Sequence, residues 1–182
     1  MFKLAKVALV AWIFVLLASG STWAMAGDPT LAVKRTDKTL KSLLRQKVKV
    51  GSQEEKQLNV QIKRTVNAFL DFKELARLSL GKHWSQRTAK EQNEFVDVLG
   101  ELIERNYVKR LRDNLNYRLE YRKQDISGEG ARVLTAVKLK KDGRTEEVLI
   151  EYLMHRGKNG WMVYDVITDE VSVVRNYRSQ FN

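Results

Sequence analysis

The segment VSVVRNYRSQF, residues 171–181, places two guanidinium groups within an apolar pattern. At 100° per residue, one side of a helix over this segment would carry Val171, Val174, Tyr177 and Phe181. Arg175 and Arg178 would flank that side, with their stems lying on it and their charges at its rim. Such a helix could close over an apolar cavity and present cations at its mouth. Simple packing with solvated arginines would produce the same pattern.

Few residues offer acid–base or metal chemistry. His83 and His155 are the only histidines, and they lie far apart in the sequence. No H-E-x-x-H, G-x-S-x-G or glycine-rich phosphate loop is present, so we expect neither a metal site nor a cofactor. Asp165 stands out because its segment, WMVYDVI, is otherwise apolar. If buried, it would accept hydrogen bonds from backbone or an arginine, or act with His155 in proton transfer.

Helix signals dominate the first half of the chain. The expected N-terminal signals are Asp28-Pro29, Ser52 with Glu55, Asp71 with Glu74, and Thr88 with Glu91. Apolar residues recur with helical period after each signal, and Gly81 is a natural helix end. The last signal predicts the longest helix, from about residue 89 to about residue 112.

The second half of the chain changes to a period of two, which is typical of strands. We expect four strands, at about 117–121, 133–139, 148–154 and 161–167, joined by turns that include Asp142-Gly143 and Asn159-Gly160. Thr168 or Asp169 would cap a terminal helix with Glu170 in its first turn. The predicted class is α+β, with N-terminal helices packed on a curved four-stranded antiparallel meander sheet and a C-terminal helix.

The start of the chain has the order of a secretory signal peptide. Lys3 and Lys6 precede an apolar run over residues 7–18, and Ala24-Met25-Ala26 follows as a cleavage site. An uncleaved anchor is the alternative, although the apolar run is short for a membrane span. We therefore expect a signal peptide at 1–26 and one domain at 27–182. The net charge of +11 favours anionic surfaces, which outside the cytosol are lipid headgroups or acidic partners rather than nucleic acid.

Two stretches resemble a known family. GWMVYDVITDE, residues 160–170, and the VSVVRNYRSQF that follows it resemble the C-terminal signature of the MlaC family, also called the toluene-tolerance or ABC-transporter auxiliary family. FLDFKELARLSLGKHWSQRTAKEQNEF, residues 69–95, is similar to the family's pattern of a D-F-x-x-x-A helix, then L-G-x-x-W, then a capped helix. The resemblance covers the chain from about Ser52 to its end.

The resemblance implies a periplasmic protein that carries phospholipid and is not an enzyme. Its partners would be an inner-membrane ABC transporter complex and an outer-membrane lipoprotein complex, and we expect a monomer. A hopanoid-carrying branch of the family leaves the cargo class open. Arg175 and Arg178 could meet a phosphate headgroup at the mouth of the cavity, although the resemblance does not assign them that role.

A carrier of acyl chains needs an apolar cavity between sheet and helices, because each buried methylene contributes about 0.8 kcal/mol. The candidate sheet wall is Val133, Val137, Val148, Ile150 and Tyr152, and the candidate helix wall is Phe69, Leu75, Leu99 and Leu102. Each of these residues could instead belong to a closed core. Two other classes remain: an isomerase-like or hydratase-like enzyme on a nuclear transport factor two-like scaffold, using Asp165 and His155, and a cationic adaptor without a cavity.

Overall fold

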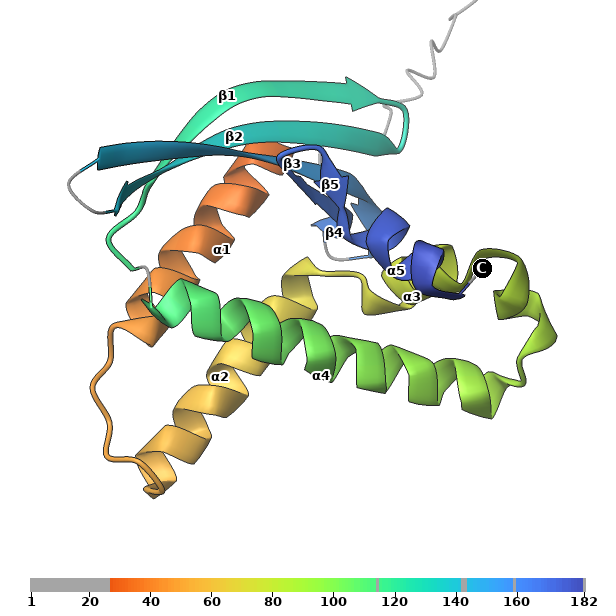
Figure 1. Ribbon diagram of the computed structural model, residues 1–182, viewed down its shortest axis with the longest axis horizontal. Coiled ribbons are helices and arrows are strands. Elements are labelled where there is room, and N and C mark those ends of the chain that lie inside the picture. The colour runs from red at the N-terminus through yellow and green to blue at the C-terminus, as the bar shows by residue number, and fades with distance from the viewer. Residues whose placement is uncertain (1–26, 114, 142–143, 159, 182) are drawn as a thin grey trace, which may run out of the picture.

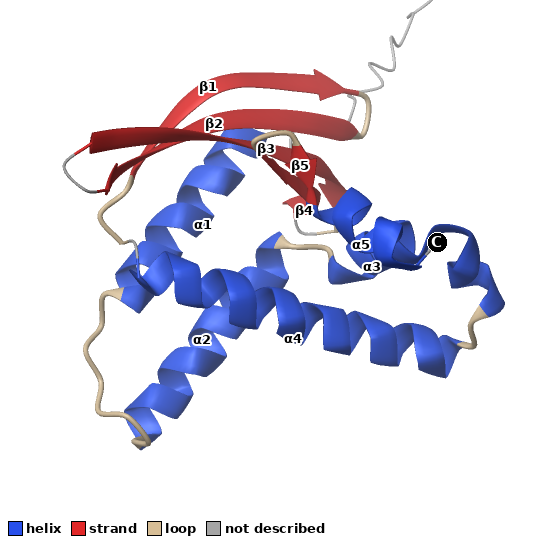
Figure 2. Ribbon diagram, in the orientation of Figure 1, coloured by secondary structure: helices blue, strands red, loops and turns tan. Residues whose placement is uncertain are grey.

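The computed structural model describes residues 27–113, 115–141, 144–158 and 160–181. The predicted signal peptide, the Asp142-Gly143 turn and Asn159 lie outside the described residues. Helices occupy the first half: α1 (Pro29–Leu44), α2 (Gln53–Phe69), α3 (Phe72–Leu80), the short 3-10 helix η2 (Gly81–Gln86) and α4 (Ala89–Asp113). Strands follow: β1 (Arg118–Ser127), β2 (Gly130–Lys141), β3 (Arg144–Gly157), β4 (Gly160–Thr168) and β5 (Val171–Ser172), and the chain closes with α5 (Val173–Phe181) (Figure 2).

The predicted α+β fold is confirmed, with one strand more than expected. The sheet is an antiparallel meander in the order β1-β2-β3-β4-β5. Figure 1 shows it arching over the helices, with α1 running beneath it and α4 on the side of the helical layer away from the sheet. Register shifts between Tyr121 and Lys123 in β1, and between Leu153 and Met154 in β3, accompany this curvature. Within the described ranges, no helix combines the length and apolar character needed to cross a membrane.

The predicted starts of the first four α-helices are confirmed by cap hydrogen bonds. The side chains of Asp28, Ser52 and Asp71 accept from backbone N–H groups two or three residues further on. Thr88 and Glu91 form a reciprocal capping box, in which each side chain accepts from the backbone N–H of the other. Local sequence therefore determines where these helices begin.

The predicted cap of the terminal helix is wrong. Asp169 and Glu170 have φ of 46° and 68° and form the turn between β4 and β5, and Thr168 belongs to β4. Val171 lies in β5 and is 62% exposed, so it does not share the apolar side of the helix. A β-branched residue favours extended backbone, and this one pairs with β4 before the helix begins. The Ser172 hydroxyl accepts from Arg175 N at 3.0 Å and caps α5.

The buried apolar residues form three clusters rather than one. The first joins α1 to the sheet through Val33, Val133, Met154, Trp161 and their neighbours. The second joins α3, α4 and α5 through Leu75, Leu99, Ile103 and Val173, and the third joins α1 to α2 through Leu43, Leu58, Ile62 and Val66. Leu70 packs against all three. Most domains have one contiguous core. Here the core is divided, and the three clusters meet around Leu70.

Candidate functional site

An apolar cavity of about 220 Å³ lies where the three clusters meet. The helices contribute Val33, Leu40, Val66, Phe69, Leu75, Ile103 and Val173, and Leu70 lies just after the end of α2. The sheet contributes Ile150, Tyr152, Val166 and Thr168. Members of all three clusters thus face one another across unfilled space, which leaves room for an apolar guest.

The sheet wall follows from strand alternation. Ile150 and Tyr152 lie two residues apart on β3 and point to the same face of the sheet. Their partners on β4 are Thr168 and Val166, which also line the cavity. The Tyr152 ring packs edge-on against Phe69 of α2, with ring centroids 6.0 Å apart. Burial raises the pKa of the Tyr152 phenol, so this wall stays uncharged.

One seam of the cavity is polar. Asp37 of α1 and Tyr117, just before β1, both line it, and the Tyr117 hydroxyl donates a hydrogen bond to the Asp37 carboxylate. Lys41 Nζ lies 3.1 Å from the same carboxylate and 3.7 Å from the centre of the Tyr117 ring. Burial raises the pKa of Tyr117, and the Asp37 carboxylate raises it further. These contacts join α1 to the segment that enters β1.

Four of the nine predicted wall residues line the cavity: Phe69, Leu75, Ile150 and Tyr152. They come from α2, α3 and β3, so the structure brings together residues that are far apart in the sequence. That these side chains contact a lipid stays a prediction.

The other five predicted wall residues do not line the cavity. Val133 is fully buried in the cluster around Trp161 and Met154, and Leu99 is buried among side chains of α3 and α5. Val137 and Val148 pair with each other on β2 and β3, beyond Ile150 on the way to the hairpin turn. Leu102 is 41% exposed on α4. Sequence periodicity identifies the buried face of a helix or strand. That face is longer than the cavity, so many residues on it pack against other side chains instead.

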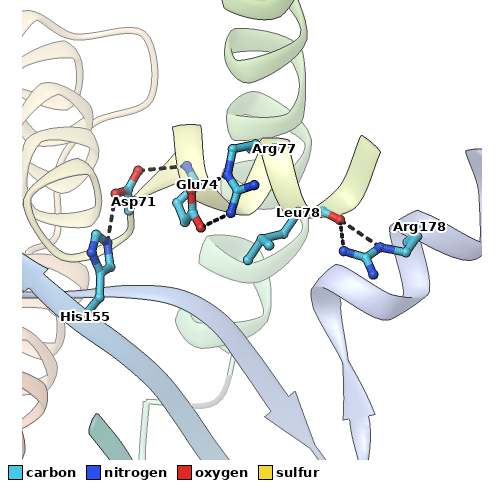
Figure 3. Close-up of polar contacts among 6 residues, drawn as sticks. All are labelled: Asp71, Glu74, Arg77, Leu78, His155 and Arg178. Atoms are coloured by element: carbon cyan, nitrogen blue, oxygen red, sulfur yellow. Dashed lines mark hydrogen bonds and ion pairs between the residues drawn. The ribbon is translucent and has the colours of Figure 1, made fainter. Parts of the chain in front are cut away.

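The two predicted rim arginines lie outside the cavity lining. Arg178 donates to the Leu78 carbonyl at the end of α3, with Nε at 2.8 Å (Figure 3). Gly81 follows α3 with φ of 54°, a backbone conformation that favours glycine. Arg175 donates to the Glu170 carbonyl at 3.0 Å. Both arginines therefore make contacts that hold α5 in place, and a headgroup role for them stays a prediction.

The candidate catalytic pair is not assembled at the cavity. Asp165 is buried and accepts from the Ser172 hydroxyl at 2.6 Å and from Val174 N at 3.1 Å. Its predicted structural role as an acceptor of backbone hydrogen bonds is thereby confirmed. His155 lies 2.9 Å from Asp71 instead, and neither His155 nor Asp165 lines the cavity. Among the described residues, no group of three or more His, Cys, Asp or Glu side chains could hold a metal ion.

Helix α3 is held at both of its ends (Figure 3). At its start, Asp71 caps the helix and meets His155 of β3. At its end, Arg178 of α5 donates to the Leu78 carbonyl. The helix dipole also favours a cation at this C-terminal end. Between these ends, Glu74 accepts two hydrogen bonds from Arg77, which lower the pKa of the glutamate. Leu75 is thereby presented to the cavity from a fixed helix.

Helix α1 was missed as a cavity wall. It contributes Val33, Thr36, Asp37 and Leu40. Their spacing of i, i+3, i+4 and i+7 is that of one helix face, so the signal was present in the sequence. Other apolar residues of α1 do not face the cavity: Leu43 and Leu44 pack against α2, and Leu31 is 43% exposed.

A family model described as the MlaC protein matches residues 34–182. Among solved structures, the phospholipid-binding protein from Ralstonia solanacearum, in complex with a phospholipid, aligns with a TM-score of 0.68. The identity is 21%, over 85% of this chain and 86% of that one, which supports a shared fold. A second solved chain is a substituted variant whose name contains NTF2. It aligns over 60% of this chain and 97% of its own at 15% identity. Its TM-score of 0.30 is too low to indicate a shared fold.

A search among curated proteins found no significant match. The family model nevertheless spans most of the chain, including every element from α2 to α5. The protein therefore belongs to the MlaC family.

Proposed function

We propose that this protein binds phospholipid by burying acyl chain in the cavity between sheet and helices. The observation that carries the proposal is the unfilled apolar space at the junction of three core clusters. Every methylene that enters this space leaves water and contributes about 0.8 kcal/mol. The shared fold with a protein solved in complex with a phospholipid supports the same conclusion.

The cargo then travels through the periplasm between the outer membrane and an inner-membrane ABC transporter. In this proposal residues 1–26 are a signal peptide that is cleaved after Ala26, and residues 27–182 form a single lipid-binding domain. The domain acts as a monomer without enzymatic activity and meets an outer-membrane lipoprotein complex at one end of its route. Family membership and the basic net charge support this route.

A two-chain lipid would need more room than the cavity now has. Pockets that bury a drug-sized ligand hold about 300–1,000 Å³, whereas this cavity holds about 220 Å³. Loading therefore requires a wall to move. Helix α4 is the wall best suited to moving, because it packs mainly against α3 and lies away from the sheet (Figure 1). Ile103 and Glu104 of α4 line the cavity and would move with it.

The experiment is native mass spectrometry of the purified protein, followed by solvent extraction and uptake of labelled phospholipid. Ile150→Trp places a large ring in the cavity and should abolish uptake. Leu149→Trp is the matched control, because Leu149 is the adjacent residue, faces the other side of β3 and is 45% exposed. Its uptake should equal that of the unsubstituted protein.

Co-purified phospholipid at about one molecule per protein, lost in Ile150→Trp alone, is the expected result. The mass of the extracted guest separates phospholipid from a hopanoid. A protein that contains no lipid and takes up none would contradict the proposal. Equal uptake by the two tryptophan variants would show that the guest lies elsewhere.

A further inference from the structure

A cationic groove of about 730 Å³ lies on the outer side of α1, between that helix and the start of β1. Its basic lining residues are Lys34, Lys38, Lys41, Arg45 and Arg118, and its one acid is Asp37. Lys34, Lys38 and Lys41 of α1 and its C-cap residue Arg45 have the spacing i, i+4, i+7 and i+11, which puts them along one stripe of the helix. Helix α1 thus turns apolar residues to the cavity and cations to the groove.

The exposed ammonium groups of Lys34 and Lys38 are available for an anion. Lys41 is engaged by Asp37 at 3.1 Å, Arg118 lies 3.5 Å from Glu120, and Arg45 donates to a backbone carbonyl. In the part of the chain that the structure describes, no hydrogen bond or ion pair engages the side chain of Lys34 or Lys38. Asp37 adds little repulsion, because its carboxylate already interacts with Lys41 and the Tyr117 hydroxyl.

The groove and the apolar cavity are neighbours. Asp37 and Tyr117 line both, so the hydrogen bond between them forms part of the partition. A molecule with an oily part and an anionic part could place one on each side of this partition.

A second groove, between α2 and α4, has the opposite charge. It shares Leu70 and Glu104 with the cavity. Its acidic lining residues are Asp71, Asp97, Glu101 and Glu104, and Lys63 is its one basic residue. An anion is therefore repelled at the α2–α4 side and attracted at the α1–β1 side. The difference in charge gives a bound amphiphile a preferred direction.

We propose that the phosphate ester of the cargo binds in the α1–β1 groove, beside Lys34 and Lys38, while the acyl chain occupies the cavity. This inference rests on the proposed function and adds the site and the orientation of the headgroup. The lysines act as exposed point charges, so the interaction is modest and weakens as salt is added. Two exposed pairs of this kind together change the affinity by about two- to thirtyfold.

The test measures affinities for phosphatidylglycerol and for diacylglycerol with the same acyl chains, which lacks the phosphate. The groove variant is Lys34→Gln with Lys38→Gln. Its matched control is Lys56→Gln with Lys73→Gln, which removes the same charge from exposed positions on α2 and α3. We expect the groove variant to lose about two- to thirtyfold in affinity for phosphatidylglycerol at low salt and nothing for diacylglycerol. The control should lose neither.

Equal phosphatidylglycerol affinity in the two double variants would overturn the headgroup site. An equal loss for both lipids would also overturn it, since the substitutions would then act through the cavity or the fold. Failure of the unsubstituted protein to bind either lipid would instead contradict the proposed function. Failure of the headgroup site and failure of lipid binding therefore give different results.

Two further measurements identify the source of the phosphate. Glycerol 3-phosphate should occupy the groove weakly in the lipid-free protein and be displaced by phosphatidylglycerol. Simultaneous binding of both would mean a site for a free phosphate and would overturn the headgroup assignment. A groove variant that loses only its sedimentation with anionic vesicles, while binding dispersed lipid normally, would mean a membrane-docking surface and would overturn it as well.

Discussion

The two ends of strand β3 differ in how their inward-facing residues are packed. Met154 is fully buried in the cluster with Val133 and Trp161, whereas Ile150, four residues earlier on the same face, borders the cavity. The Trp161 indole N–H donates to the Gly27 carbonyl at 3.0 Å and ties the packed end to the start of α1. One sheet thus supplies a solid core at one end and an unfilled wall at the other. Stability and ligand binding are therefore separable by position along a strand.

The largest expected effect is on the packed end. Met154→Ala should lower the free energy of unfolding by about 2–5 kcal/mol, because it leaves a hole in a close-packed cluster. Lipid uptake per folded molecule should not change. Chemical denaturation measures the first quantity, and labelled-lipid uptake measures the second. The paired variant Ile150→Ala should cost about 1 kcal/mol or less, since that side chain already borders empty space. Equal losses in the two variants would break the comparison.

The next effect concerns Asp165, which holds α5 against the edge of the sheet beside the cavity. Asp165→Ala should cost about 1–3 kcal/mol, because the buried Ser172 hydroxyl and Val174 N–H lose their acceptor. Asp169→Ala is the control. Asp169 is exposed and accepts only a 3.3 Å bond from Leu149 N, so its loss should be small. A greater loss for Asp169 would mean that the turn, rather than Asp165, holds the helix start.

A smaller effect is expected at the polar seam of the cavity. Tyr117→Phe removes the hydrogen bond to Asp37 and should cost about 0.5–1.5 kcal/mol. If the proposed function holds, the weakened seam should also speed the release of lipid to acceptor vesicles. Denaturation and a fluorescent-lipid transfer assay measure the two effects. An unchanged release rate in a destabilised variant would show that cargo does not pass between α1 and Tyr117.

The smallest expected effect is on stability at alkaline pH and concerns Tyr121. Burial, together with the nearby Asp37, raises the pKa of Tyr121 to about 12 from 10.0. The folded protein therefore holds this proton more tightly than the unfolded chain, and the stability involved is present below pH 10 and lost as the pH rises toward 12. Tyr121→Phe should flatten the fall in stability between pH 10 and pH 12. An unchanged slope would mean that the tyrosine is not part of the packed end.

The sequence by itself determined the elements that depend on neighbouring residues. Each cap at Asp28, Ser52, Asp71 and Thr88 acts on a backbone N–H within three residues, so its signal is complete in a short window. Strand alternation is equally local, which is why the meander and the inward face of Ile150 and Tyr152 were predictable. The family could be recognised for the same reason, because its signatures are continuous stretches.

Only the tertiary structure decided which inward residues enclose empty space. Val133 and Ile150 are both β-branched and lie on the same face of the sheet, yet Val133 is buried in the cluster with Trp161 and Ile150 borders the cavity. The start of α5 was beyond local reach as well, because Asp165 of β4 holds the capping Ser172 hydroxyl and also accepts from Val174 N. The physical reason is that cavities and cross-strand caps depend on distances between elements far apart in sequence, and periodicity describes one element at a time.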